Sequence, residues 1–560
     1  MKNNHKSKIE IFSLGGLGEN GRNLYVCNIN HQLFIFDAGI KYPGEDLLGV
    51  DAVIPDIKYL IENKNKIVGL FLSNAHDEHI GAVPNILEEL NIPVYGSRFT
   101  IALVEDAIKE RGKNPKDYRL YQVRPTDRLT FSNVMVSFFR TSFSIPDSLG
   151  IALHTKDGVI VYTSNFTFDQ SATRQYQTDY QALTSLAREG VLALLSESIG
   201  ADKPTITSSD RLSYELEEQF KLAPGRIIVS VYSSDLKQIQ RIIDIAHAQH
   251  KKIAIIGRKV QRLVDLAVKM GYLRFPQGML VKLKYIDETT TNNFSNLVVI
   301  ATGERHEPFD ALIRMARKID RLIHIEPTDK IIIAAPPVTG NEIKVARTID
   351  LMYRTGADVH VIKKSLFPST HASGQDLKLM MNLLQPKYII PVIGEYRHLH
   401  NHAKVAESIG YSRDQIVIME NGYFATFING EFENVEKRLT IDQVLVDGLS
   451  VGDINSVVLR DRQVLSQDGI VLAIVTVDYK TKTILSGPEI VSRGFIYVKE
   501  NEDIIQTLTS YIKDAFNDGT KDPQSFDMTK IKSDLREKMG KYLYKETKRK
   551  PIVMLIVNEL

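Results

Sequence analysis

The chain has 560 residues, of which 43% are hydrophobic and 25% charged. These are values of an ordinary globular protein, and they exclude a disordered, collagen-like or membrane-bundle chain. One hydrophobic core cannot serve a chain of this length, so we expect roughly three or four domains of about 100 to 200 residues each. Seventy Lys and Arg against 68 Asp and Glu leave a net charge of +2, so a polyanionic partner would have to be held by local basic surface.

The cysteine count and the lack of long apolar runs bear on the compartment. Cys27 is the single cysteine, so it cannot form an intramolecular disulfide, and a lone thiol suits a reducing compartment. The amino-terminal sequence lacks the apolar core of a signal peptide, and no run approaches the ~20 residues that span a bilayer. We therefore expect a cytoplasmic protein without a membrane segment.

The first part of the chain alternates short strands with turns. Residues 8–75 contain the strand-like runs KIEIFSL, NLYVCNI, QLFIFDAG and IVGLFLS, which are divided by turn signals. A helical pattern follows His79 in IGAVPNILEEL, and strands return at VMVSFFRT, GIALHT and GVIVYTS. Mixed strands with helices behind them predict two packed sheets covered by helices.

Strict alternation of strands and helices begins near residue 205 and continues to about 360. The strands RIIVSVY, KKIAIIG, NLVVIATG, KIIIAAP and DVHVIK are joined by amphipathic helical segments, which predicts a parallel, doubly wound α/β unit. The runs QDLKLMMNLL, YIIPVIG and HLHNHAKVAESIG then return to the earlier pattern, so we expect the unit to be inserted within the first domain. From residue 441 a polar stretch leads to a small α+β terminal domain, with helices near 501–515 and from 525.

Gly16, Gly18 and Gly21 match the spacing of a dinucleotide-binding loop. The run after them, NLYVCNI, reads as a strand and not as the helix that would offer amide groups to a pyrophosphate. We therefore interpret the glycines as a hairpin turn.

The segment LFLSNAHDEHIGAVPNIL places polar side chains between a strand end and a helix. The loop carries Asn74, His76, Glu78 and His79, and its two imidazoles and one carboxylate could converge on a divalent cation. The alternative is a solvated helix start at which Asp77 and Glu78 favour the amino end of the helix dipole.

The spacing of this loop is similar to the HxHxDH loop of metallo-β-lactamase-fold hydrolases, and the flanking sequence resembles ribonuclease J. The phrases GGLGENGRNLYV, FDAGIKYPGEDLLGVDAVIPDI, FSIPDSLGIALHT, YTSNFTFDQ, PPVTGNE, PVIGEYRHL and SGPEIVSRGFIYV follow the order of that family over nearly the whole chain. On this resemblance the chain is identified as a member of the family, as a divergent paralogue of the second type.

The resemblance implies an α/β architecture: a metallo-β-lactamase αββα sandwich with an inserted doubly wound β-CASP domain, and a small α+β carboxy-terminal domain. We expect the metallo-β-lactamase domain over residues 1–204 and 363–440. The β-CASP domain is expected over 205–362, a linker over 441–457 and the terminal domain over 458–560.

The resemblance also implies a depleted metal site. Of seven ligand positions for two ions, His76, Glu78 and His79 keep a donor side chain that suits a metal, whereas the remaining four positions are Asn74, Phe143, Asn165 and Ile393. Zinc sites close with four N, O or S ligands, so we expect a weakly bound divalent metal, Mn²⁺ or Mg²⁺, in place of a tight zinc pair. Such a site predicts strongly attenuated cleavage, with His76, Glu78, His79 and His371 as catalytic candidates.

RNA contacts are implied for two groups of residues. His371 matches the position that contacts the scissile phosphate, and Glu197 matches an acidic position that orients a neighbour. The expected RNA-binding residues are Tyr232, Ser233, Ser234 and Arg258 in the β-CASP block, and Phe367, Pro368, Ser369, Thr370, His371 and Ser373 before a helix. The alternatives are strand-to-helix turns in the first group and a helix cap formed by Ser373 and Asp376 in the second.

A basic run near the end of the chain, KYLYKETKRKP, interleaves Tyr542 and Tyr544 with lysines and arginine. Basic charge beside aromatic rings can hold single strands, and the alternative is a solvated amphipathic helix.

We carry three hypotheses for the function. In the first, the chain is an attenuated 5′-to-3′ exoribonuclease with endonuclease activity in messenger decay and ribosomal RNA maturation. In the second, it is an RNA-binding or scaffold subunit that forms homo-oligomers and hetero-oligomers with an active ribonuclease J paralogue. In the third, it is a small-molecule hydrolase on the same fold, which fold alone would permit.

Overall fold

The computed structural model describes residues 7–44, 47–170, 172–203, 210–281, 296–303, 307–338, 340–448, 450–452, 456–478, 480–496, 501–519 and 527–560. The chain forms one compact unit from residues 1–42 and 53–444 and another from residues 43–52 and 445–560. The side chain of Arg258 lies outside what the structure describes.

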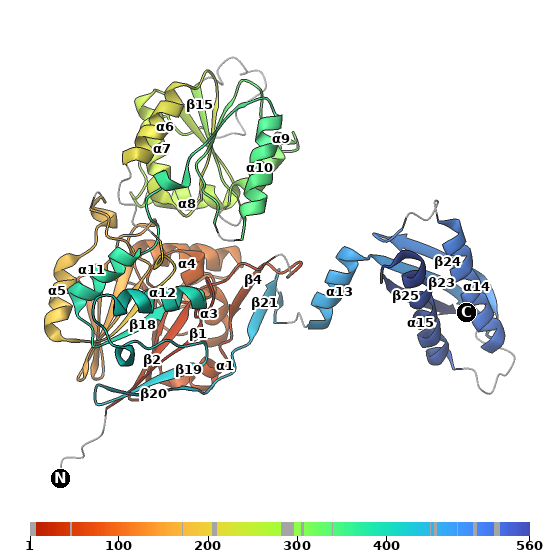
Figure 1. Cartoon of the computed structure of the whole chain (residues 1–560), viewed down its shortest axis with the longest axis horizontal. Coiled ribbons are helices and arrows are strands. Elements are labelled where there is room, and N and C mark those ends of the chain that lie inside the picture. The colour runs from red at the N-terminus through yellow and green to blue at the C-terminus, as the bar shows by residue number, and fades with distance from the viewer. Residues whose placement is uncertain are drawn as a thin grey trace, which may run out of the picture. The chain divides into compact units, whose positions relative to one another are not determined.

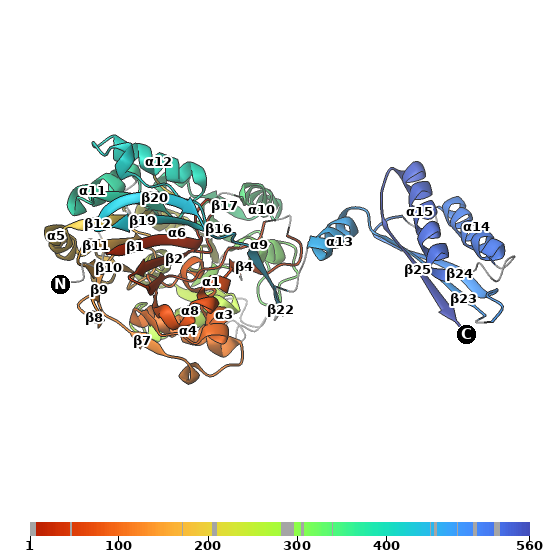
Figure 2. The ribbon, with the colours of Figure 1, turned by 90° about the horizontal axis from the view of Figure 1, so that it is seen from below.

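The first unit contains two sheets that pack face to face (Figures 1 and 2). One has the order β20-β19-β1-β2-β3-β5-β6-β7 and the other the order β18-β12-β11-β10-β9-β8. The first sheet comprises β1 (Lys8–Gly15), β2 (Leu24–Ile29), β3 (Gln32–Phe36), β5 (Ile67–Phe71), β6 (Val94–Gly96), β7 (Leu120–Gln122), β19 (Tyr423–Ile428) and β20 (Glu431–Lys437). The second comprises β8 (Arg128–Phe131), β9 (Val134–Arg140), β10 (Leu149–Thr155), β11 (Gly158–Ser164), β12 (Val191–Glu197) and β18 (Tyr388–Val392).

Alternation along the strands creates three apolar layers. The inward faces of the two sheets share one core, in which Phe36 of β3 stacks on Tyr162 of β11 with ring centroids 5.2 Å apart. The outer face of the first sheet carries α1 (Lys58–Glu62), α2 (Asp77–Ile80), α3 (Val83–Leu90) and α4 (Arg98–Glu110). The outer face of the second carries α5 (Tyr180–Glu189), α11 (Gly374–Leu384) and α12 (Tyr396–Glu407). The predicted αββα sandwich is confirmed.

The inserted block is built on a parallel sheet with the order β14-β15-β13-β16-β17. Its strands are β13 (Ile227–Ser230), β14 (Lys252–Ile256), β15 (Leu297–Ala301), β16 (Lys330–Ile333) and β17 (Asp358–Val361). One face packs on α6 (Asp210–Lys221), α7 (Leu236–Ala248) and α8 (Arg258–Lys269), and the opposite face packs on α9 (Phe309–Ala316) and α10 (Glu342–Arg354). Helices on both faces make the block doubly wound, as predicted (Figure 1).

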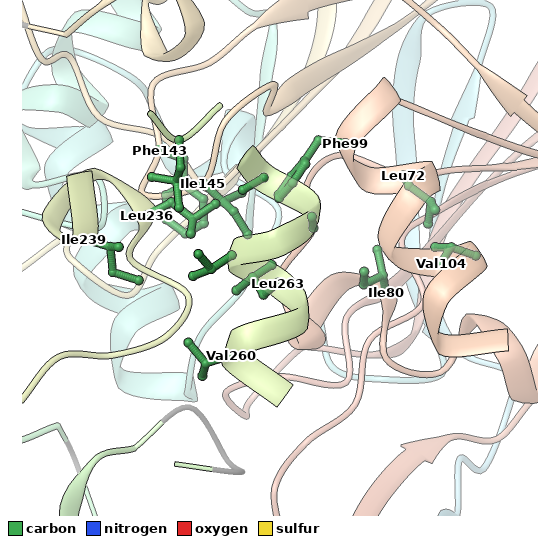
Figure 3. Packing of buried hydrophobic residues seen from close by; sticks show 14 of the residues in the cluster. Leu72, Ile80, Phe99, Val104, Phe143, Ile145, Leu236, Ile239, Val260 and Leu263 are labelled. Atoms are coloured by element: carbon green, nitrogen blue, oxygen red, sulfur yellow. The ribbon is translucent and has the colours of Figure 1, made fainter. Parts of the chain in front are cut away.

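The block interrupts the sandwich between two neighbouring strands. The chain leaves the second sheet after β12 and returns to it at β18, which pairs with β12 in parallel at Ala193 and Tyr388. A continuous apolar cluster joins the block to the sandwich: Phe143 and Ile145 lie beside Leu236 of α7 (Figure 3). The predicted insertion is therefore confirmed.

The glycine-rich segment is a turn, as the sequence indicates. β1 and β2, which flank it, pair antiparallel with Phe12 opposite Val26. Gly16, Gly18 and Gly21 all have positive φ, at 91°, 72° and 88°. A strand on each side, and a backbone that glycine adopts most readily, leave no strand-to-helix phosphate loop here.

The second unit contains a small α+β fold. Its sheet has the order β24-β23-β25, with β24 (Ile484–Arg493) antiparallel and β25 (Ile552–Glu559) parallel to β23 (Ile470–Val477). Helices α14 (Glu502–Gly519) and α15 (Met528–Thr547) pack on one face of it. Helix α13 (Ser456–Gln467) precedes this sheet. The stretch expected as a linker contains β21 (Gln443–Asp447) and β22 (Ser450–Val451). Strand β4 (Ala52–Pro55) lies much earlier in the chain, before α1. No helix among the described residues has the length and apolarity needed to cross a membrane.

Candidate functional site

The candidate residues gather where strands of both sheets end. Asp37 follows β3, Ser73 and Asn74 follow β5, Asn165 follows β11, Glu197 ends β12, and Ile393 follows β18. Side chains at the carboxyl ends of neighbouring strands meet at one edge of a sheet. The arrangement brings together positions that lie up to several hundred residues apart in the sequence.

Asp37 is a buried carboxylate that sequence reasoning did not single out. Its Oδ1 accepts a hydrogen bond from the Ser73 amide at 2.7 Å, and its Oδ2 accepts one from the Tyr162 hydroxyl at 2.6 Å. The Ser73 hydroxyl and His79 Nδ1 each lie 2.7 Å from Oδ2. The only available signal was an acid directly after the apolar strand QLFIF. These donors compensate a charge that is fully buried.

His79 is held by this carboxylate and is itself fully buried. Burial acts to lower the pKa of His79, but the neighbouring Asp37 outweighs it, so the pKa is raised. The bond to Asp37 engages Nδ1, and Nε2 is buried without a hydrogen bond of normal geometry to any described residue. A carboxylate bonded to one ring nitrogen is an arrangement that metal-ligating histidines commonly have.

Asn74 is turned into the protein and is 1% exposed. Its Oδ1 accepts from the His76 amide at 3.0 Å, and its Nδ2 lies 3.2 Å from the hydroxyls of both Ser73 and Ser164. These contacts occupy the side-chain atoms that could face a cation. The Asn74 amide thus stabilises the loop.

His76 and Phe143 lie beside each other. The His76 ring is tilted against the Phe143 ring with centroids 4.8 Å apart, and its Nε2 lies 3.0 Å from the Ser144 hydroxyl. Phe143 is 4% exposed and also contacts the ring of His371 at 6.1 Å. An apolar ring therefore fills the position between two histidines.

Glu197 and His371 form a second carboxylate–imidazole pair. Glu197 Oε2 lies 2.7 Å from His371 Nδ1 and accepts from Asn165 Nδ2 at 2.8 Å. Its Oε1 accepts from the backbone amides of Phe166 and Ala372. Burial acts to raise the pKa of Glu197, but His371 and these amides outweigh it, so the pKa is lowered. The orienting role expected of Glu197 stays a prediction, and the bond to His371 is the contact through which it would act.

Ile393 is fully buried and has a φ of 53°. A β-branched side chain rarely adopts this left-handed backbone. The Ile393 amide donates to the Tyr25 hydroxyl at 3.0 Å, and its carbonyl accepts from the Ser198 amide. These bonds hold the backbone turn although the side chain offers no donor atom.

The side chains at the expected ligand positions do not fit a pair of metal ions. Asn74 and Asn165 use their amides in internal hydrogen bonds, and Phe143 and Ile393 have no ligating atom. Glu78 keeps its carboxylate, which forms no hydrogen bond with any residue in the part of the chain that the structure describes. Across the described ranges, no three or more His, Cys, Asp or Glu side chains are grouped so as to hold an ion.

The expected RNA-binding residues fall in two places. Phe367 is buried, Thr370 is exposed, and Pro368, Ser369 and His371 are partly exposed in the segment before α11. Ser373 is buried and forms the predicted capping box: its hydroxyl accepts from the Asp376 amide and donates to the Asp376 carboxylate. The second group lies in the inserted block. Tyr232, Ser233 and Ser234 follow β13, and Arg258 is the first residue of α8. The Tyr232 hydroxyl donates to the Pro336 carbonyl.

Comparison with known proteins identifies relatives over the full chain. Residues 224–352 match the model of the ribonuclease J β-CASP domain, residues 360–418 match a Zn-dependent metallo-hydrolase RNA specificity domain, and residues 457–560 match the ribonuclease J carboxy-terminal domain. Ribonuclease J2 of Bacillus subtilis is 38% identical over 100% of both chains. Ribonuclease J 2 of Staphylococcus epidermidis is 37% identical over 99% of this chain and 98% of its own.

A solved structure shares the fold at low identity. It is a protein of unknown function from Enterococcus faecalis, with a TM-score of 0.53 and 14% identity, and it covers 75% of this chain and 100% of its own. This likeness supports the fold and nothing about activity.

Proposed function

The chain belongs to the ribonuclease J family, and we propose that it takes part in RNA processing and decay with its own cleavage strongly attenuated. Messenger turnover and ribosomal RNA maturation are the processes we assign to it. Its 5′-to-3′ exonuclease activity is weak, and endonuclease activity accompanies it. It works as a subunit beside a more active paralogue.

The observation that carries the proposal is the state of the ligand positions. Four of them hold Asn74, Phe143, Asn165 and Ile393, of which two are committed to internal hydrogen bonds and two are buried apolar side chains. Two metal ions would generate a hydroxide and stabilise the charge that develops on the phosphodiester in the transition state. The side chains present do not assemble such a centre, so cleavage is slow, since each ~1.4 kcal/mol added to the barrier costs tenfold in rate.

The groups that would contact RNA are better preserved than the groups that would hold metal. The Glu197 carboxylate orients His371, whose side chain is 26% exposed. Residues 367–371 connect the inserted block to α11 and bind the RNA together with His371. Tyr232, Ser233 and Ser234 bind the 5′ end of the RNA. In this proposal His371 contacts a phosphate, and residual metal binding falls to His76, Glu78 and His79.

The first experiment measures catalysis and binding separately. The purified protein is incubated with 5′-monophosphorylated RNA in Mn²⁺, and mononucleotide release is compared with that of a His76→Ala, His79→Ala variant. We expect weak release that the variant abolishes, and RNA binding that the variant keeps. Elemental analysis of the native protein reports whether Mn²⁺, Mg²⁺ or zinc is present in substoichiometric amount.

The alternative is a catalytically inactive subunit, favoured by the buried apolar rings at Phe143 and Ile393. It predicts equal release from the wild type and the variant, together with co-purification of an active paralogue and a changed cleavage pattern. If the protein binds no single-stranded RNA and associates with no paralogue, both readings fail and a small-molecule hydrolase becomes the better hypothesis.

A further inference from the structure

Helix α15 and the turn after it carry an excess of basic charge that the strand-end site does not use. Residues 527–550 contain nine Lys and Arg against four Asp and Glu. The inner face of the helix is apolar, because Leu535, Met539 and Leu543 are buried in the core of the second unit. Its charged residues therefore lie on the outer face, and the helix combines a structural side with a basic side.

An exposed aromatic ring lies within this basic surface. Tyr544 is 44% exposed, and the ammonium groups of Lys548 and Lys550 lie 5.8 and 5.0 Å from its ring centroid. Tyr542, two residues earlier, packs on the core. Tyr542 is partly buried by this packing, whereas the ring of Tyr544 is open to solvent and has cations beside it.

The turn after α15 holds the basic residues in place. Lys548 caps the helix in a left-handed conformation, and its amide donates to the Tyr544 carbonyl. The Arg549 amide donates to the Thr547 hydroxyl, and the Lys550 amide donates to the Asp468 carboxylate. Backbone bonds thus fix the turn, and among the described residues no carboxylate forms an ion pair with the ammonium of Lys548 or Lys550.

We propose that Tyr544, Lys548 and Lys550 form a contact for single-stranded RNA on the carboxy-terminal domain, in which a base stacks on the tyrosine ring and the lysines bind flanking phosphates. Stacking platforms beside cationic side chains are how proteins hold single strands without reading sequence. An acidic protein would use the cations without needing an open ring, which is why RNA is the partner that fits better. The inference rests on the proposed RNA-processing function and adds a binding surface outside the unit that carries the strand-end site.

The test measures binding of a fluorescein-labelled oligouridylate to the full chain in EDTA, over a series of salt concentrations. Tyr544→Ala should weaken binding about fivefold or more, the low end for one stacked base, without changing the salt dependence. Lys548→Gln with Lys550→Gln should lower the slope of log Kd against log salt by about 1.4, since each phosphate contact on a single strand contributes about 0.7. Tyr544→Phe, which keeps the ring, should bind as the wild type does.

Matched variants control for exposed rings and for net charge. Tyr214→Ala removes a tyrosine that is 65% exposed on α6, and Lys109→Gln with Lys113→Gln removes the same charge from exposed positions on and after α4; both should leave RNA affinity unchanged. Wild-type binding that Tyr544→Ala and the double lysine variant do not alter would overturn this inference and leave the proposed function intact. If the variants instead lose only association with another protein, the surface is a protein contact and the inference is also overturned. A wild type that binds no RNA overturns both proposals.

Discussion

At the residue scale, Asp37 shows how a buried charge is accommodated at the strand ends. A carboxylate without exposure costs several kcal/mol unless donors surround it. Ser73, His79 and Tyr162 supply those donors from three different elements. The sequence contains the hint of an acid after a strand, but it cannot indicate that Tyr162, 125 positions away, donates to it.

Asp37→Asn tests this network. The asparagine amide has one acceptor oxygen, and its NH₂ group faces groups that are themselves donors. At least one of the donors that bind Asp37 therefore loses its acceptor. The negative charge next to His79 is also lost. Breaking a buried pair from one side costs about 3 to 5 kcal/mol. We expect a thermal unfolding midpoint lower by many degrees, whereas Asp117→Asn, at an exposed position, should shift it little. Equal midpoints for Asp37→Asn and the wild type would contradict the role assigned to Asp37.

His402 gives the same region a pH dependence. It is fully buried, its Nδ1 lies 3.0 Å from the Ser198 hydroxyl, and burial lowers its pKa to about 4. Between pH 6.5 and 4, His402 is protonated in the unfolded chain but stays neutral in the folded chain. The free energy of unfolding therefore falls as the pH falls through this window. From pH 7 to pH 5 the loss is about 2 kcal/mol. Urea unfolding of the wild type and of His402→Gln, which does not titrate, should show this difference in slope, and parallel curves would refute it.

At the scale of elements, patterns of hydrophobicity predicted most of the strands and helices of the inserted block. Strands β13 to β17 and helices α7 to α10 lie within a few residues of their expected positions, because amphipathic helices and short apolar strands have distinct periods. Strand β12 was missed since all seven of its residues are buried, and a continuous apolar run reads equally well as helix or strand. The left-handed backbone of Ile393 could not be anticipated either, because it depends on bonds to Tyr25 and Ser198.

The cap of α11 separates a structural role from a binding role. Ser373→Ala removes the hydroxyl that accepts from the Asp376 amide, which should cost about 1 kcal/mol of stability. Ser412→Ala, at the exposed cap of a short 3₁₀ turn, should cost less. Denaturant unfolding and oligouridylate binding are measured on the same samples. A loss of RNA affinity with unchanged stability would instead assign Ser373 to a phosphate contact.

At the scale of the whole molecule, the ligand positions are tied to the packing that joins the sandwich to the inserted block. Phe143 belongs to a cluster that includes Leu236 and Ile239 of α7 and Val260 of α8 (Figure 3). A polar ring at this position would interrupt that cluster. The sequence correctly indicates which side chains lack a donor, but it does not reveal that Phe143 contributes to joining the two parts of the unit.

Restoring ligand side chains at the four replaced positions should therefore lower the stability of the protein, and a bound metal ion should offset that loss. In a variant with Asn74→His, Phe143→His, Asn165→Asp and Ile393→His, the new carboxylate lies where Asn165 Nδ2 is now 2.8 Å from Glu197 Oε2, and two carboxylates repel at that distance. We expect the variant to unfold below the wild type in EDTA. Mn²⁺ should then raise its midpoint by several degrees, since a ligand at about 100 times its Kd adds about 2.7 kcal/mol.

The response to metal distinguishes a rebuilt site from general salt effects. The wild-type midpoint should move little with Mn²⁺, because its Asn165 and Phe143 side chains supply no anionic or imidazole ligand. Adding His79→Ala to the restored variant removes a shared ligand and should abolish the response. Differential scanning calorimetry in EDTA and in Mn²⁺ measures all three proteins. A wild type stabilised as strongly as the restored variant would mean that other side chains already hold an ion, and the attenuation proposed for this chain would then require another cause.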